Sequence, residues 1–166
     1  MTPGKDNLHL KARHDIKKHL DQEHSELLNS LKSLSTIYGS IGESARALLR
    51  LLVPHVTEEE KMVIPLLSSI ENLLEGRADK EELSHLSQLG NRLAENYNYF
   101  LKEHSDIEEK GESLLEMARN TGKTEAISTI EELQLHIFLE ELFLYPFSIL
   151  AGKYAALAVS EKSQSR

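Results

Sequence analysis

Apolar residues recur at helical spacing in four segments of the chain, and turn signals rich in glycine and polar residues separate these segments at 38–40, 75–79 and 120–122. Short connections make sequential helices antiparallel neighbours. The pattern therefore predicts an all-α fold, an up-down antiparallel four-helix bundle. The predicted inward-facing residues are, in chain order, Ile16, Leu20, Leu27, Leu31, Leu34, Ala45, Leu48, Leu49, Leu52, Val56, Leu86, Leu89, Leu93, Phe100, Ile107, Ile130, Leu133, Ile137 and Leu144.

Three prolines fall inside the predicted helices, at Pro54, Pro65 and Pro146. A proline removes one main-chain hydrogen bond and costs about 3 kcal/mol in a helix interior. We expect a kink or a helix end at each of these positions.

The 166 residues are the size of one ordinary domain. We expect a single domain over 1–166, with its core at about 10–157 and a polar tail at about 160–166. The N-terminus lacks the apolar segment of a signal peptide, and the longest apolar run, 142–152, is far shorter than the roughly 20 residues of a spanning helix. These features predict a cytoplasmic protein without a membrane partner.

Charge and cysteine content narrow the chemistry further. The net charge of −8 disfavours binding to nucleic acid or to an anionic membrane surface. The chain has no cysteine, which excludes disulfides, thiolate metal sites, iron–sulfur clusters and cysteine nucleophiles. Any metal site in this protein must use histidine and carboxylate ligands.

One spacing pattern of histidine, glutamate and proline occurs twice in the chain. HVTEEEKMVIP begins at His55, and HIFLEELFLYP begins eighty-one residues later at His136. Each copy has glutamates four and five places after the histidine and a proline ten places after it. A residue four places along a helix lies only about 40° away on the same face, so His55 with Glu59 and His136 with Glu140 form two same-face pairs. A single such pair is usually a surface ion pair, but the duplication favours a shared role.

The repeat extends to the other two predicted helices. QEHSELL around His24 is similar to KEHSDIE around His104, and the two histidines stand eighty residues apart. Each half of the chain thus carries one isolated histidine and one His-x-x-x-Glu pair. In a bundle, four imidazoles and two carboxylates can converge on the axis.

Such a buried cluster is costly unless its polar groups are paired, and divalent cations would pair them. Mixed nitrogen and oxygen ligation with two carboxylates that can bridge is typical of a two-metal site, with iron preferred. Without metal, the closeness of the two carboxylates predicts raised pKa values for them.

The pattern of His24, His55-x-x-x-Glu59, His104 and His136-x-x-x-Glu140 resembles the hemerythrin-like, or HHE cation-binding, domain family over about residues 10–157. The resemblance implies two Fe ions in a non-haem di-iron centre with bridging carboxylates. Family members carry or sense oxygen, respond to iron or protect against nitrosative stress. The implied metal ligands are His24, His55, Glu59, His104, His136 and Glu140.

The sequence departs from the oxygen-carrying members at two places. Those members have a further histidine four places after the third-helix ligand and an aspartate five places after the fourth-helix histidine, where this chain has Glu108 and Glu141. Glu108 shares a helix face with His104, so it is a candidate to replace the missing histidine or is simply solvated; the solvated interpretation is favoured. Glu60 and Glu141 lie about 140° from their histidines on a regular helix, so reaching the metal would require a π-bulge.

Other residues have secondary interpretations. Tyr97 lies on the ligand face, as a packing residue or a hydrogen-bond donor to a bound oxygen species. Met62 and Phe143 are interpreted as core residues that can also line a pocket for small gases. The remaining histidines have no counterpart in the other half and are interpreted as surface residues: His9, His14, His19 and His85.

The preferred function is a di-iron protein that binds, senses or handles a small oxidant such as oxygen or nitric oxide, or handles iron; a binding protein is favoured over an enzyme. A ferritin-like di-iron oxidoreductase is one alternative, but it requires two Glu-x-x-His motifs, and this chain has only Glu82 to His85. A metal-independent helical interaction protein is the other. The sequence identifies no protein partner.

Overall fold

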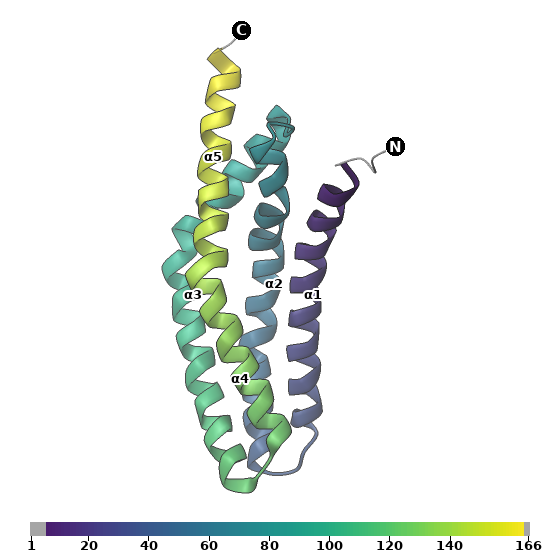
Figure 1. Cartoon of the computed structure of the whole chain (residues 1–166). Helices are drawn as coiled ribbons and strands as arrows, with labels where there is room; N and C mark the ends of the chain where they lie inside the picture. The colour runs from purple at the N-terminus through teal and green to yellow at the C-terminus, as the bar shows by residue number, and fades with distance from the viewer. Residues whose placement is uncertain (1–5, 165–166) are drawn as a thin grey trace. The chain divides into compact units, whose positions relative to one another are not determined.

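The computed structural model describes the backbone of residues 6–164 and the side chains of residues 16–161. Within this range the chain is helical and contains no strand, which confirms the predicted all-α helical bundle. The elements are α1 (Asp6–Ser35), α2 (Ser40–Leu74), α3 (Lys80–Thr121), α4 (Thr124–Leu139), the π-helix η1 (Glu140–Leu144) and α5 (Tyr145–Gln164). Figure 1 shows that α4, η1 and α5 follow one another without a break.

The turns lie where the sequence predicts them. Gly76 and Gly122 follow the ends of α2 and α3 with φ values of 66° and 65°, a left-handed conformation that only glycine adopts without strain. After Gly122, the Lys123 amide donates to the Ala118 carbonyl, which closes the helix end. The Asp79 carboxylate caps α3 by accepting the Glu82 amide at 2.8 Å.

The chain divides into two compact units, and it passes between them within its helices. Among the described residues, the first unit contains 6–21, 59–97 and 143–164, and the second contains 22–58 and 98–142. The prediction of a single domain over 1–166 stays a prediction. Its proposed polar tail is helical as far as Gln164.

The second unit holds a leucine-rich core built from all four helical segments that enter it. The turn between α1 and α2 and the turn between α3 and α4 lie at the same end of this unit (Figure 1). Each fully buried leucine stabilises the fold by roughly 1.5–3 kcal/mol relative to an exposed one. The core residues are Leu27, Leu31, Leu34, Ile41, Ala45, Leu48, Leu52, Val56, Ile107, Leu114, Leu115, Ala118, Ala126, Ile130, Leu133 and Ile137.

The first unit is held partly by a close crossing of α3 and α5. A Cβ atom added at Gly90 would lie 2.5 Å from the Gly152 Cα, so the two backbones touch without intervening side chains. Tyr145, Ser148 and Ala155 are fully buried on α5. The core predictions fail at one position of α1, because Ile16 is 45% exposed.

The prolines behave differently from one another. Pro54 and Pro65 lie inside the continuous helix α2, so the alternative of helix ends at these two positions is wrong. Pro146 is the second residue of α5 and is separated from η1 by Tyr145 alone. In a regular α-helix the Pro146 ring would clash with the carbonyl of residue 142, and the wider π turn relieves this clash.

The run Thr124–Glu161 is long and apolar enough to cross a membrane, judged by length and composition alone. Core helices of soluble proteins pass the same test, although here only 28% of the apolar window is buried. The cytoplasmic location therefore stays a prediction.

Candidate metal centre

Four histidines and one glutamate of the predicted ligand set lie together in the second unit. His24 comes from α1, His55 from α2, His104 from α3 and His136 from α4, and Glu140 is the first residue of η1. All five are buried, with exposures of 9% or less. Polar groups at this depth require partners, and these residues lie close enough to provide them for one another.

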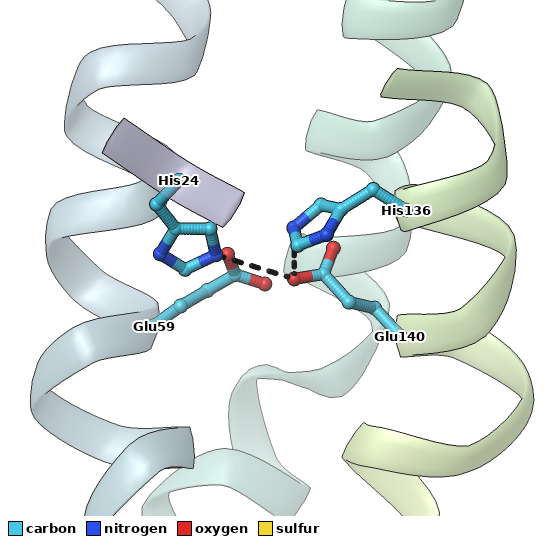
Figure 2. Close-up of side chains that lie close together, drawn as sticks. All are labelled: His24, Glu59, His136 and Glu140. Carbon is cyan, nitrogen blue, oxygen red and sulfur yellow. Dashed lines mark ion pairs between the residues drawn. The ribbon is translucent and has the colours of Figure 1, made fainter. Parts of the chain in front are cut away.

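The Glu140 carboxylate lies between two pairs of histidines. Its Oε1 is 2.9 Å from the His136 Nε2 and 3.8 Å from the His24 Nε2, while its Oε2 is 3.3 Å from the His104 Nε2. Figure 2 shows Glu140 with His24 and His136, and dashed lines mark its ion pairs with these two histidines. The two oxygens of one carboxylate thus face different imidazoles.

Glu140 also connects two groups of atoms that can ligate metal. Candidate ligand atoms of His24, His136 and Glu140 lie within 4.8 Å of one another, and the same holds for His55, His104 and Glu140. The buried His/Glu cluster is therefore compatible with metal binding.

Three further glutamates contact the outer nitrogens of the histidines. Glu103 lies 3.1 Å from the His55 Nδ1, and Glu141 lies 2.9 Å from the His104 Nδ1. Glu23 lies 3.6 Å from the His136 Nδ1. Their side chains are 24–40% exposed, so they form a partly solvated layer outside the buried cluster. Metal-ligating histidines typically use their second ring nitrogen in this way.

These outer contacts determine where the imidazole protons lie. An ionised carboxylate can only accept, so the Nδ1 atoms of His55 and His104 donate to Glu103 and Glu141. In the neutral imidazoles the Nε2 atoms then carry lone pairs, and these two atoms are only 2.9 Å apart. Two facing lone pairs at this distance require a cation or a proton between them, and in the metal-free chain that proton also allows the His104 Nε2 to hydrogen-bond with Glu140. Adjacent ligands at about 2.1 Å from one metal ion are separated by about 3.0 Å in octahedral and about 3.4 Å in tetrahedral geometry.

The Glu140 carboxyl has a perturbed pKa. Burial by itself raises this pKa, but hydrogen bonds with His104, His136 and His24, together with the charge of His136, hold it well below the ordinary value of 4.5. The expectation of a raised pKa is wrong for Glu140, because the histidines around it stabilise the charged form by more than burial destabilises it.

Glu59, the sixth predicted ligand, belongs to the first compact unit. It lies one turn after His55 on the continuous helix α2 and is only 2% exposed. Within its unit it accepts a hydrogen bond from the Tyr145 hydroxyl. Figure 2 draws Glu59 with His24, His136 and Glu140.

Tyr145 is a residue that sequence reasoning missed. It is fully buried, and its ring packs edge-on against Tyr97 at 6.3 Å. On an uninterrupted α-helix Tyr145 would lie about 180° from His136, on the opposite face. The π-helix η1 precedes Tyr145 and changes this register by about one residue. The proline after Tyr145 is the signal that could have indicated such a change.

A pocket of about 250 Å³ opens beside His136 in the second unit. Its walls combine the acidic residues Glu23, Glu26 and Glu132 with apolar residues of α1 and α4. His136 is the most exposed of the four clustered histidines, at 9%. An acidic entrance of this kind attracts cations toward the cluster.

The sequence also matches a family model. The Hemerythrin HHE cation binding domain matches residues 15–148, which is more than half of the chain and includes all six predicted ligands. The chain belongs to the hemerythrin HHE cation-binding family. This match confirms the resemblance inferred from the repeated strings. Comparisons with curated proteins and with solved structures gave no match.

The structure decides most of the secondary interpretations of this hemerythrin-like chain. Glu108 is exposed, as predicted. Glu60 is exposed as well, whereas Glu141 contacts the His104 Nδ1 and does not face Nε2. Met62 is buried, but Phe143 is 45% exposed, so its interpretation as a core residue is wrong. The π-helix turns its side chain outward and places Tyr145 inside instead.

The remaining histidines follow the prediction where it can be judged. His19 and His85 are exposed, so the histidine of the Glu82-x-x-His85 string lies at the surface and not in a ferritin-like core site. His9 and His14 lie outside the residues whose side chains the structure describes.

Proposed function

We propose that this hemerythrin-like protein binds two iron ions and uses them to bind, sense or handle a small oxidant such as oxygen or nitric oxide. The observation that carries the proposal is the position of Glu140, whose two carboxylate oxygens face two different histidine pairs. One shared carboxylate between two nitrogen-rich groups is the arrangement that a pair of metal ions requires.

In this proposal His24 and His136 would hold one ion and His55 and His104 the other, with Glu140 and Glu59 as the carboxylate ligands. Glu59 is included because it is buried and lies one turn after His55 on α2. The Tyr145 hydroxyl fixes the orientation of the Glu59 carboxylate by donating a hydrogen bond to it.

Iron is the preferred metal because imidazole and carboxylate together suit it and the chain offers no thiolate. When bound, two iron ions supply reversible one-electron chemistry and open coordination positions for small ligands. The position of the additional histidine in oxygen carriers is taken by the exposed Glu108. This difference favours sensing or redox handling of the oxidant over its reversible transport.

The surrounding residues have defined tasks. Glu103 and Glu141 hold the Nδ1 protons of two ligands and so direct their Nε2 lone pairs inward. The buried apolar residues Val56, Ile107 and Ile137 on the same helices limit access of water to the histidines. The pocket beside His136 gives small molecules a route from solvent. A cytoplasmic location and the absence of nucleic-acid and membrane partners remain part of the proposal.

The test is metal analysis of protein purified without oxygen after iron-replete expression, followed by optical spectra before and after exposure to air or nitric oxide. We expect about two iron ions per chain and a spectral change with at least one of the gases. His104→Ala should lose iron, and Glu108→Ala, which changes an exposed residue one turn away, should keep it. Recovery of a single zinc ion or of no metal would refute the di-iron proposal.

A further inference from the structure

A row of large apolar side chains lies exposed on the C-terminal helix of the first unit. Its members are Phe143, near the end of η1, and Phe147, Leu150, Tyr154 and Leu157 on α5, and each is 45–67% exposed. Phe143 and Phe147 stack on each other, with ring centroids 6.3 Å apart and an interplanar angle of 9°. We call these five residues the α5 stripe. Its intervals alternate between four and three residues, which places all five side chains along one face of the helix.

The opposite face of α5 is already occupied. Ser148, Tyr145 and Ala155 are fully buried, and Gly152 touches the backbone of Gly90 on α3. The helix cannot rotate to bury the stripe without breaking this close crossing. The α5 stripe therefore faces away from the unit that holds α5.

The exposed area of the stripe lies in the upper part of the range for the largest apolar patch of a monomer, about 300–600 Å². With roughly 200 Å² per large apolar side chain and about half of it exposed, five residues present on the order of 500 Å² per copy. Two such surfaces together bury about 1,000 Å², which is the lower limit of a specific protein–protein interface. The stripe is thus large enough for a second copy of the same surface.

The spacing of the stripe also suits a second copy. An alternation of four and three residues is the pattern of a helix-pairing seam. In an antiparallel pair with its two-fold axis at Leu150, Leu150 meets itself and Phe143 meets Leu157, while Phe147 lies within one residue, about 1.5 Å along the helix, of the position opposite Tyr154. Every member of the stripe then has an apolar counterpart.

A lipid surface fits these observations less well. Helices that lie on membranes carry lysines and arginines beside their apolar face. Lys153 is the sole basic residue in 143–160, and it donates to Asn91 on α3 at 2.8 Å. The net charge of −8 adds no attraction to anionic lipids.

We propose that the α5 stripe is a homodimer interface, in which the α5 helices of two copies pair antiparallel about Leu150. This inference is independent of the metal and its identity, since none of the five residues belongs to the buried His/Glu cluster. A weak dimer is expected, because the interface area lies at the lower limit for specific association.

The first test is sedimentation analysis of the full chain from about 1 to 300 µM, a range suited to a weak interface. The average mass of the wild-type protein should rise from 18.8 kDa toward twice that value. Leu150→Glu should stay at the mass of one chain with an unchanged circular dichroism spectrum. The matched control is Leu74→Glu, which changes a 78% exposed leucine at the end of α2 and should dimerise like wild type.

The second test uses the absence of native cysteine. Leu150→Cys should form a disulfide-linked dimer under mild oxidation, because residue 150 lies on the two-fold axis. Leu157→Cys alone should not, since its two copies would be separated by about 21 Å along the helices. Combining Leu157→Cys with Phe143→Cys should restore linkage.

Three outcomes would overturn the proposal. The first is a single-chain mass for the wild-type protein at all concentrations. The second is equal loss of dimer in Leu74→Glu and Leu150→Glu. The third is a protein that stays monomeric and binds neutral phosphatidylcholine vesicles through Leu150, which would identify lipid as the occupant.

Discussion

The neighbouring residues Glu140 and Glu141 provide the sharpest test of the candidate centre. If His136 and Glu140, four residues apart, are the ligand pair of α4 and η1, then Glu140 binds metal and Glu141 only orients the ligand His104. The structure separates them clearly: Glu140 is 3% exposed and faces three imidazoles, whereas the Glu141 side chain is 39% exposed and contacts the His104 Nδ1. Replacing each by alanine should therefore have different consequences.

The expected magnitudes follow from these contacts. Glu140→Ala removes the carboxylate that both histidine pairs share, so at least one ion should be lost even with excess iron present. Glu141→Ala removes only a partner of an imidazole Nδ1. Loss of such an outer partner typically weakens metal binding by about 10–100-fold, which corresponds to about 1.4–2.8 kcal/mol.

The assay is anaerobic reconstitution with iron, metal analysis at saturation, and a competition titration with a chelator. Glu140→Ala should retain one iron ion or none, while Glu141→Ala should retain two at saturation and release them at lower chelator concentration than wild type. Circular dichroism verifies that both variants fold. If Glu141→Ala empties the site and Glu140→Ala keeps both ions, the ligand register derived from the α-helical spacing is wrong.

Three further predictions concern stability. Because the pKa of Glu140 is lowered in the folded metal-free chain, its ionised form stabilises the fold above pH 4.5, and this stabilisation is lost as the pH falls through the lowered pKa. In urea unfolding of the metal-free proteins, the advantage of wild type over Glu140→Gln should shrink on acidification below pH 4.5; an advantage that grows would contradict the lowered pKa. Gly90→Ala should lower the free energy of unfolding by about 1–3 kcal/mol, because the new Cβ would meet the Gly152 backbone at 2.5 Å. Gly111→Ala on the same helix, whose Cβ would lie an ordinary 3.5 Å from Ile130, is the control and should be neutral or stabilising in the same denaturation experiment. Chelation of the metal-loaded protein should lower its unfolding free energy by several kcal/mol, and an unchanged melting temperature would count against a structural role of the ions.

Much of the fold could be predicted from periodicity because each helix is long and has one apolar face. Leu48, Leu93 and Ile107 are fully buried as the spacing indicates. The three turns also follow from local chemistry, since glycine or a capping aspartate stands at each. Both signals depend only on residues near each other in the chain.

The helix geometry at each proline could not be predicted from such local signals. A proline inside a helix can be accommodated by a kink, an end or a widened turn, and packing decides among them. Pro65 stays inside an α-helix, while Pro146 follows a π-helix, although both stand ten residues after a clustered histidine. The exposed Phe143 and the buried Tyr145 both result from this difference.

The contacts of the outer glutamates with the histidines could not be predicted for a different reason. Glu23 and Glu103 each precede a predicted ligand histidine, but they contact the histidine of a neighbouring helix, His136 and His55 respectively. Sequence spacing describes one helix at a time and carries no information on such cross-helix pairs. The repeated Glu-His dipeptides, Glu23-His24 and Glu103-His104, were the available signal for these contacts. Each glutamate recurs beside a predicted ligand, although neighbouring residues on one helix do not face each other.

The two halves of the repeat also differ in a way that bears on the chemistry of the centre. Nine residues after its histidine, the first string has Ile64 and the second has Tyr145. Both side chains are buried in the first unit, but only the tyrosine can donate a hydrogen bond, and it donates to Glu59. Glu140, in contrast, is held by imidazoles. If the imidazoles bind the ions, their hydrogen bonds to Glu140 are lost while the Tyr145 hydroxyl still draws electron density from Glu59, so Glu59 would then be the weaker donor of the two to a cation. The repeat thus supplies a nearly symmetric set of ligands, and the difference between Ile64 and Tyr145 makes its two carboxylates chemically unequal.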